Sequence, residues 1–178
     1  MDTHSELEAT RWVFPQLCDG VRAIARDVTE PRHYLKLCGA GEDLRRALPP
    51  RWEIQPAAYF MTATQTAFDP KPLPEGYRME LHQSGPVTHA RILAPDGGVA
   101  ASGHAAETAN AFIYDRIETA PDHTRKGLGG AVMIALGSAR RSFAARPLLV
   151  ATEEGRGLYA RLGWTVLSPF ATAAIPGS

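Results

Sequence analysis

The hydrophobic pattern in the C-terminal half of the chain predicts a strand followed by a helix. Residues 112–120 (FIYDRIETA) are rich in aromatic and β-branched residues, which is typical of a strand, and Pro121 ends the run. From Leu128 to Phe143 apolar residues recur at helical spacing and form one apolar face. A glycine-rich turn joins the two segments.

A second strand, helix and strand follow. Residues 148–152 (LLVAT) form a short apolar run after Pro147, as expected for a buried strand. Residues 153–170 predict a short helix that ends near Gly163, and then a strand. From residue 112 onward the order is therefore strand, helix, strand, helix, strand.

The region before residue 112 contains further predicted elements. Pro15 is expected at the first turn of a helix whose apolar face extends to Val28. The elements predicted next are a strand at 33–37, a helix at 41–48, an extended segment at 52–64 interrupted at Pro56, and a connector at 68–76. Strands are then expected at 77–83 and 87–94, and the turn at 96–98 (DGG) forms a hairpin with a third strand.

The turn before the long helix carries the strongest chemical signal in the chain. Gly127, Gly129 and Gly130 follow the cations Arg125 and Lys126. Without Cβ atoms the backbone can bend tightly and let an anion approach its N–H groups. The first N–H groups of the helix have no partners within it, and that end carries roughly half a positive charge. The turn is therefore predicted to bind a phosphate group.

Two nucleotide-binding motifs are alternatives for this turn. A P-loop requires a lysine after its glycines, whereas Lys126 precedes them, so this reading fails. The dinucleotide-binding motif G-x-G-x-x-G is matched at Gly127 and Gly129, but Val132 occupies the position of its third glycine. Glu153 follows the next strand, as the ribose-binding acid would, so the dinucleotide alternative is weakened and stays open.

The order of elements and a second motif, GLYARLGW at residues 157–164, resemble the GCN5-related N-acetyltransferase superfamily over about residues 77–175. The resemblance implies an α/β (α+β) fold with a mixed, mostly antiparallel sheet, in which central strands four and five splay apart between flanking helices. We expect a single domain over residues 1–178, with an acyl-CoA-binding core at 77–178. Residues 1–76 depart from the family order.

That atypical N-terminal segment has two explanations. It either replaces the helices that the family places between its first two strands, completing one compact domain, or it is a degenerate copy of the same strand–helix theme. The first is preferred, because neither part is large enough alone.

The resemblance also implies how acyl-CoA is held. The family loop [QR]-x-x-G-x-[GA] places its fixed glycine at Gly127 and its last position at Gly129, while Thr124 stands where glutamine or arginine is usual. The loop residues expected to bind the cofactor are Arg125, Lys126, Gly127, Leu128, Gly129 and Gly130. The strand-four residues expected to pair with the pantetheine arm and the thioester carbonyl are Ile117, Glu118 and Thr119. Thr152 replaces an asparagine found in many members.

The resemblance indicates one residue as the general acid and leaves several candidates for the general base. Tyr159 matches the tyrosine near the sulfur, and a phenol with a pKa near 10 stays protonated at neutral pH and can act as a general acid. Asp115 is the first choice as base and Glu118 the alternative; they are expected on opposite faces of strand four because side chains alternate along a strand. His104, Glu107, the C-terminal backbone and ordered water remain competitors.

Composition excludes several classes of function. The chain has 178 residues, 44% of them hydrophobic, with 19 basic and 19 acidic side chains, so it has no net field that favours nucleic acid or an anionic membrane. No apolar run is long enough to span a membrane, and the N-terminus lacks a signal-peptide pattern, so a cytoplasmic location is expected. Cys18 and Cys38 are predicted to be partly buried thiols, and no metal is expected.

The predicted function is an acyl-CoA-dependent N-acyltransferase, an acyltransferase that transfers groups other than amino-acyl groups. An acetyl group would pass from acetyl-CoA to an amine of a small molecule or peptide, by direct attack in a ternary complex. The protein is expected as a monomer or homodimer without nucleic-acid or membrane partners. A catalytically weak acyl-CoA sensor or interaction protein is the alternative, and the sequence does not identify the acceptor.

Overall fold

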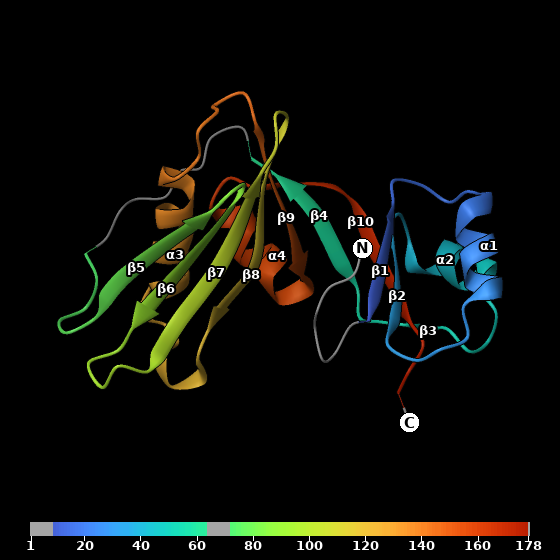
Figure 1. Cartoon of the computed structure of the whole chain (residues 1–178), viewed down its shortest axis with the longest axis horizontal. Helices are drawn as coiled ribbons and strands as arrows, with labels where there is room; N and C mark the ends of the chain where they lie inside the picture. Colours follow the sequence, from blue (N-terminus) through green and yellow to red (C-terminus); the bar gives the residue numbers. More distant parts are fainter. Residues whose placement is uncertain (1–8, 64–71, 178) are drawn as a thin grey trace. The chain divides into compact units, whose positions relative to one another are not determined.

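The computed structural model describes residues 9–63 and 72–177. The chain forms two compact units, which are described separately (Figure 1). The first unit contains residues 1–61, 150–158 and 166–178, and the second contains residues 62–149 and 159–165. Whether they make the single domain expected from the sequence stays a prediction.

Ten strands and four α-helices are formed by the described residues. The strands are β1 (Thr10–Phe14), β2 (His33–Cys38), β3 (Glu53–Ile54), β4 (Ala58–Thr62), β5 (Arg78–Ser84), β6 (Val87–Leu93), β7 (Val99–Glu107), β8 (Ala111–Thr119), β9 (Arg146–Thr152) and β10 (Thr165–Ala174). The helices are α1 (Asp19–Asp27), α2 (Gly41–Ala47), α3 (Leu128–Ser138) and α4 (Glu153–Arg161), with a short 3-10 helix, η1 (Pro121–His123).

The second unit is built on an antiparallel sheet that one helix covers. Strands β5, β6, β7 and β8 pair in sequence order, and β9 pairs with β8 in parallel. Gly97, with φ +87°, permits the tight β6–β7 turn that the DGG sequence predicted. Helix α3 packs across these strands through buried side chains (Figure 1). Those side chains are Leu128, Val132, Met133 and Leu136.

A β-bulge interrupts the pairing of β7 with β8. Ser102 pairs with Glu118 while His104 pairs with Asp115, so two β8 residues lie opposite Gly103. Gly103 has no side chain, and a Cβ atom added at this position would lie only 2.4 Å from Ile117 Cδ1. Ile117 consequently points to the α3 side of the sheet. The bulge reverses the alternation along β8 beyond Asp115.

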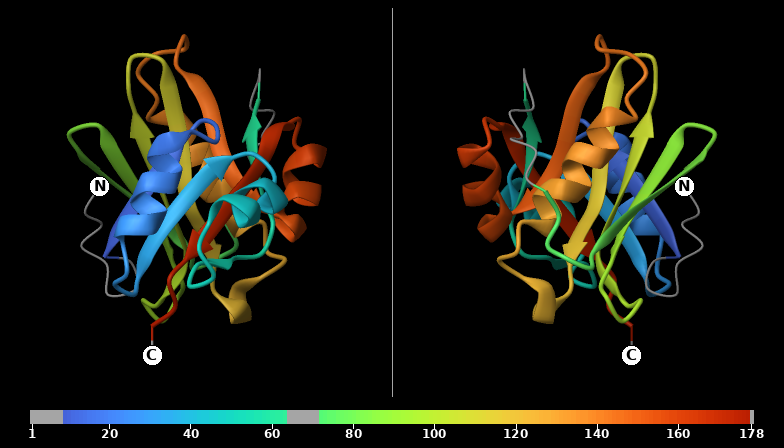
Figure 2. Two further views of the ribbon diagram at one scale, coloured as in Figure 1. Left: turned by 90° about the vertical axis from the view of Figure 1, so that its right-hand side faces the viewer. Right: turned by 90° about the vertical axis from the view of Figure 1, so that its left-hand side faces the viewer.

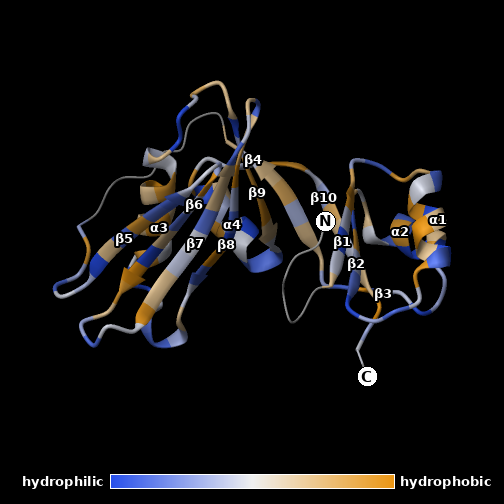
Figure 3. Ribbon diagram, in the orientation of Figure 1, coloured by the Kyte–Doolittle hydropathy of each residue, from blue (hydrophilic) through white to orange (hydrophobic). Residues whose placement is uncertain are grey.

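The first unit repeats a strand–helix–strand connection. Strands β1 and β2 are parallel and joined through α1, as β8 and β9 are joined through α3. Within this unit the strand order is β1-β2-β10-β4, and β3 also pairs with β10. Figure 2 shows α1 and α2 on the same face of β2. In Figure 3 hydrophobic and hydrophilic residues both occur around α1, in keeping with an amphipathic helix that packs into the core around Trp52.

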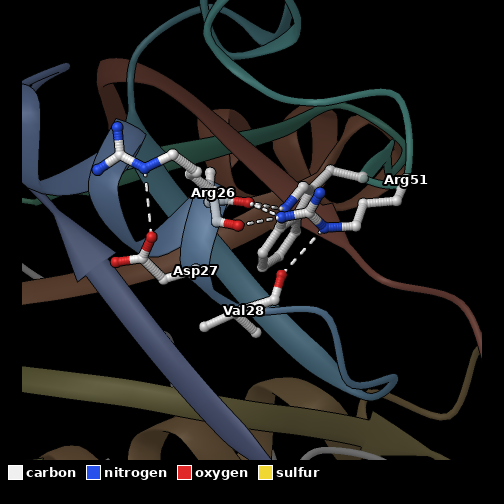
Figure 4. A network of polar contacts seen from close by, with 6 residues as sticks. Arg26, Asp27, Val28 and Arg51 are labelled. Carbon is white, nitrogen blue, oxygen red and sulfur yellow. Dashed lines mark hydrogen bonds and ion pairs between the residues drawn. The ribbon is translucent and has the colours of Figure 1, made fainter.

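Arg51 binds carbonyl groups at the C-terminal end of α1 (Figure 4), and Trp52 donates to one of the same carbonyls. Arg51 Nε donates to the Val28 carbonyl at 3.0 Å, and its Nη2 donates to the carbonyls of Ala25 and Arg26, both at 2.6 Å. Trp52 Nε1 donates to the Ala25 carbonyl at 2.9 Å. A cation at this end of a helix is stabilised both by hydrogen bonds and by the helix dipole.

Replacing Arg51 with methionine is expected to lower the free energy of unfolding by about 1–3 kcal/mol, because the stem is kept while three charge-assisted hydrogen bonds are lost. Urea denaturation followed by tryptophan fluorescence measures this. Arg26→Met is the matched control: it removes an exposed ion pair with Asp27, and its midpoint should move little. Equal midpoints for the two variants would contradict the capping role.

Most elements predicted from the sequence are confirmed, and four details were wrong. Residues 10–14 form a strand that was not expected, because a parallel partner, β2, is available in the folded chain. Pro15 lies before α1 and not in its first turn. Helix α3 ends at Ser138, which leaves Phe143 89% exposed, and Pro147 lies inside β9. The connector predicted at 68–76 falls partly outside the described residues.

Candidate active site

The loop before α3 has the geometry of an anion-binding turn. Gly127 caps the helix with φ +77°, and Arg125 also has a positive φ, +60°. The Ala131 N–H donates to the Gly127 carbonyl at 3.1 Å, which is the first hydrogen bond of the helix. The N–H groups of the first three helical residues therefore lie at its open end, and alternating backbone conformations of this kind form concave anion sites. The buried Leu128 side chain anchors this end of α3 in the core.

Two loop side chains that could reach a ligand are engaged within the protein. Lys126 Nζ donates to Tyr77 Oη at 2.9 Å, and Tyr77 Oη pairs with His123 Nδ1 at 2.8 Å. Thr124 Oγ1 turns back to donate to the Pro121 carbonyl at 3.1 Å. Thr124 thus stabilises the turn and does not replace the longer polar side chain of the family. Sequence reasoning missed Tyr77 and His123, since their partners are distant in sequence.

The loop and the end of β8 lie next to each other. A Cβ atom at Gly129 would lie 3.4 Å from Thr119 Oγ1, while Gly130 faces open space. Glu118 and Thr119 also line a cavity of about 430 Å³ together with residues from the start of β7. The structure therefore brings the strand-four residues and the phosphate loop into one region of the second unit.

The pairing of β8 with β9 covers only the first part of β8. The parallel ladder runs from Ala111 and Arg146 to its last pair in the described residues, Tyr114 and Leu149, and β8 continues to Thr119. The described pairing therefore ends one residue before Asp115, and the bulge follows. The splay of the central strands expected from the resemblance stays a prediction.

Tyr159 lies near the last turn of α4 and belongs to the second unit. Its ring contacts Trp164 edge-on at 6.1 Å between centroids, and Trp164 contacts Tyr114 in the same way at 5.7 Å. Two ring contacts therefore link Tyr159 to Tyr114, which belongs to the last β8–β9 pair. Burial raises the pKa of the Tyr159 phenol, so the protonated form persists further into the alkaline range.

Asp115 and Glu118 lie on the same face of the sheet, which corrects the expectation of opposite faces. The in-register partners His104 and Ser102 are two residues apart on β7, so their side chains share one face, and directly paired residues share that face as well. The bulge is the physical reason. Asp115 and Glu118 are three residues apart, which in a regular strand would put them on opposite faces, but the extra residue in the bulge returns Glu118 to the face of Asp115. Asp115 is half-exposed and pairs with Arg116 at 3.2 Å.

Glu107 has a structural role. Its carboxylate is buried and accepts hydrogen bonds from the backbone N–H groups of Arg141 and Ser142 at 3.2 to 2.8 Å. The Arg141 N–H is the largest cause that lowers the pKa of Glu107. A carboxylate held in this way is a poor proton acceptor for an external substrate.

Glu153 is also occupied within the first unit. It accepts a hydrogen bond from the Tyr59 hydroxyl and pairs with Arg156, whose guanidinium lies 4.4 Å from the centre of the Tyr59 ring. These contacts disfavour the ribose-binding role considered for Glu153. A cavity of about 460 Å³ in this unit includes Tyr59 and Arg45, but none of the predicted site residues.

Residues 9–63 and 72–177 contain no group of three or more His, Cys, Asp or Glu residues that could hold a metal ion. Cys18 and Cys38 are free, partly buried thiols, as predicted. In the same ranges, no helix is long and apolar enough to cross a membrane.

Comparison with known proteins identifies the fold. No protein-family model and no curated protein matches the sequence. Among solved structures, a GCN5-related N-acetyltransferase-like protein from Streptococcus suis has a TM-score of 0.64 and 16% identity, over 89% of this chain and 76% of its own. A GCN5-related N-acetyltransferase from Kribbella flavida has a TM-score of 0.58 and 14% identity, over 82% of this chain and 69% of its own.

A third similar structure is a tandem GNAT protein from the clavulanic acid biosynthesis pathway, with a TM-score of 0.60 and 13% identity, over 88% of this chain and 68% of its own. The chain therefore has the GCN5-related N-acetyltransferase fold, a mixed and mostly antiparallel sheet with flanking helices. At these identities the likeness establishes the fold, and the activity must be argued from the site.

Proposed function

We propose that the protein is an acyl-CoA-dependent N-acyltransferase that transfers an acetyl group from acetyl-CoA to an amine of a small molecule or peptide. The supporting observation is that the second unit contains a helix end with open N–H groups, the part of β8 beyond its last pair with β9, and a partly buried tyrosine. Each corresponds to a step that acyl transfer from a thioester requires. A cytoplasmic location and a monomeric or homodimeric state stay predictions.

The backbone from Arg125 to Gly130 would hold the pyrophosphate of acetyl-CoA. Its open N–H groups and the helix dipole favour an anion without help from Thr124. Arg125 and Lys126 add positive charge, Lys126 from its position against Tyr77. The backbone of Ile117, Glu118 and Thr119 would bind the pantetheine amides and orient the thioester.

The reaction is direct attack in a ternary complex. A neutral amine adds to the thioester carbonyl carbon, and a backbone N–H of β8 stabilises the negative charge that develops on the carbonyl oxygen. The addition forms the C–N bond, and the amine nitrogen then loses a proton to a base or to water. Collapse of the tetrahedral intermediate breaks the C–S bond, and the Tyr159 hydroxyl donates its proton to the departing thiolate. Asp115 and Glu118, on one face of β8, are the carboxylates available near the acceptor.

Thermal-shift measurement with acetyl-CoA tests the proposal. At a ligand concentration one hundred times the dissociation constant, specific binding should add about 2.7 kcal/mol of stability. Release of free thiol with pooled primary amines should follow. Stabilisation by NAD and not by acetyl-CoA would favour the dinucleotide alternative, and binding without thiol release would favour a sensor.

A further inference from the structure

Three histidines and an aspartate form one row across four neighbouring strands. His82 pairs with His89, His89 with His104, and His104 with Asp115. Residues paired directly across strands point to the same face of a sheet. On β7 the residues on either side of His104 are buried against α3, whereas His104 is half-buried. The row therefore lies on the face opposite α3.

His104 is the member of this row with an unused buried nitrogen. Its Nδ1 is buried and has no hydrogen-bond partner among the described residues. Its ring stacks on His89, with centroids 4.2 Å apart and planes within 2° of parallel. The stacking restricts how the imidazole can turn, while a neutral imidazole can still accept a proton through one ring nitrogen.

The position of His104 along the sheet matches the expected reacting end of acetyl-CoA. Its partner Asp115 is the first β8 residue beyond the last β8–β9 pair among the described residues. Tyr159 connects through Trp164 to Tyr114, whose hydroxyl points toward Gly137 of α3. Tyr159, through Trp164 and Tyr114, and His104, through Asp115, are therefore both linked to the end of the β8–β9 pairing.

We propose that His104 is the proton acceptor for the attacking amine, and that the acceptor substrates are aliphatic primary amines, which arrive as ammonium ions. This inference rests on the proposed function. Asp115, paired with Arg116, and Glu118 supply negative charge on the same face and attract the cation. His89 is a positioning residue that holds the His104 ring.

His104 takes one proton from the ammonium ion, directly or through water, and later releases it to solvent. The amine nitrogen then forms the bond to the carbonyl carbon, and the sulfur leaves with the electron pair of the C–S bond and the Tyr159 proton. The second proton lost by the amine nitrogen returns to Tyr159 through water. The products are an amide, free CoA and one proton in solution.

The surrounding charges are consistent with a base that is neutral near pH 7. Burial is the main cause that lowers the pKa of His104; His89 and Arg116 lower it further, and Asp115 and Glu118 raise it. Burial also lowers the pKa of His89, with contributions from Arg91, His82 and Arg116. A lowered pKa means that the imidazole is protonated only at more acidic pH, so turnover should fall as pH drops through that lowered value.

The test compares two nucleophiles, pooled primary alkylamines and hydroxylamine, in the wild type and His104→Gln. Alkylamines are protonated near neutral pH and need a base, whereas hydroxylamine is largely neutral there. We expect His104→Gln to lower kcat/KM for alkylamines by about 10²–10⁴-fold and to lose the acidic limb of the pH profile. Transfer to hydroxylamine and the thermal shift with acetyl-CoA should be nearly unchanged.

His82→Gln is the matched control, because His82 lies in the same row two strands away, and its rates should equal those of the wild type. Equal alkylamine rates and pH profiles for His104→Gln and the wild type would overturn the role of His104 alone. Failure of the wild type to transfer to either nucleophile would overturn the proposed function and this inference together. If His104→Gln does not fold, His89→Gln should move the acidic limb upward in pH, and an unmoved limb would overturn the inference.

Discussion

Replacing Gly129 with valine is expected to abolish acetyl-CoA binding. A Cβ atom at this position already lies 3.4 Å from Thr119 Oγ1, and the two methyl groups of valine extend beyond it. They would occupy space between the open N–H groups of α3 and the end of β8, where the anion must approach the backbone. The stabilisation of about 2.7 kcal/mol expected with saturating acetyl-CoA should therefore disappear in a thermal-shift assay.

Gly130→Ala is the control for this substitution. A Cβ atom at Gly130 meets no other atom within 4 Å, and alanine is a better helix former than glycine. This variant should keep its acetyl-CoA affinity and gain up to about 1 kcal/mol of stability. Retained affinity in Gly129→Val, together with an intact fold, would refute the assignment of the loop.

Replacing Tyr159 with phenylalanine should reduce kcat by about 10²–10⁴-fold and leave the affinity for acetyl-CoA unchanged. The substitution removes only the hydroxyl proton that the thiolate would accept, while the ring contact with Trp164 is kept. Steady-state kinetics with thiol detection, together with calorimetric titration of acetyl-CoA, separates the two effects. Because burial raises the pKa of Tyr159, the wild type should stay active to higher pH than an exposed phenol would allow.

Tyr114→Phe provides the matched comparison for Tyr159→Phe. Tyr114 is buried, contacts the same Trp164 ring as Tyr159, and has a pKa raised by burial to about 12. Its hydroxyl points toward α3 and has no assigned role in the reaction. Equal kcat values for Tyr159→Phe and Tyr114→Phe would show that removing either hydroxyl has the same effect. That result would refute the role of Tyr159 as general acid.

Much of the candidate site could be predicted from local sequence, because its determinants are local. Gly127 adopts a positive φ at the helix cap, as a glycine-rich turn requires, and α3 begins at the next residue. The second motif placed Tyr159 on a short helix that ends before Gly163, as observed. Helix caps and tight turns depend on residues within a few positions of one another, which a sequence displays directly.

The facing of β8 could not be predicted in this way. Strict alternation put Asp115 and Glu118 on opposite faces, whereas the bulge opposite Gly103 puts them on one face. The bulge depends on Ile117 filling the space beside Gly103 and α3, and these residues are distant in sequence. A change of one residue in register reverses every later side chain of a strand.

By itself the sequence determined the order of elements, the anion-binding turn with its helix, and the tyrosine that follows, since short-range backbone geometry encodes all three. Only the tertiary structure decided that Thr124 and Lys126 are engaged within the protein, and that Glu107 is a buried structural carboxylate. It alone placed His104 beside Asp115, just beyond the last β8–β9 pair. Cross-strand register and burial arise from packing between distant segments, so they appear only when the chain has folded.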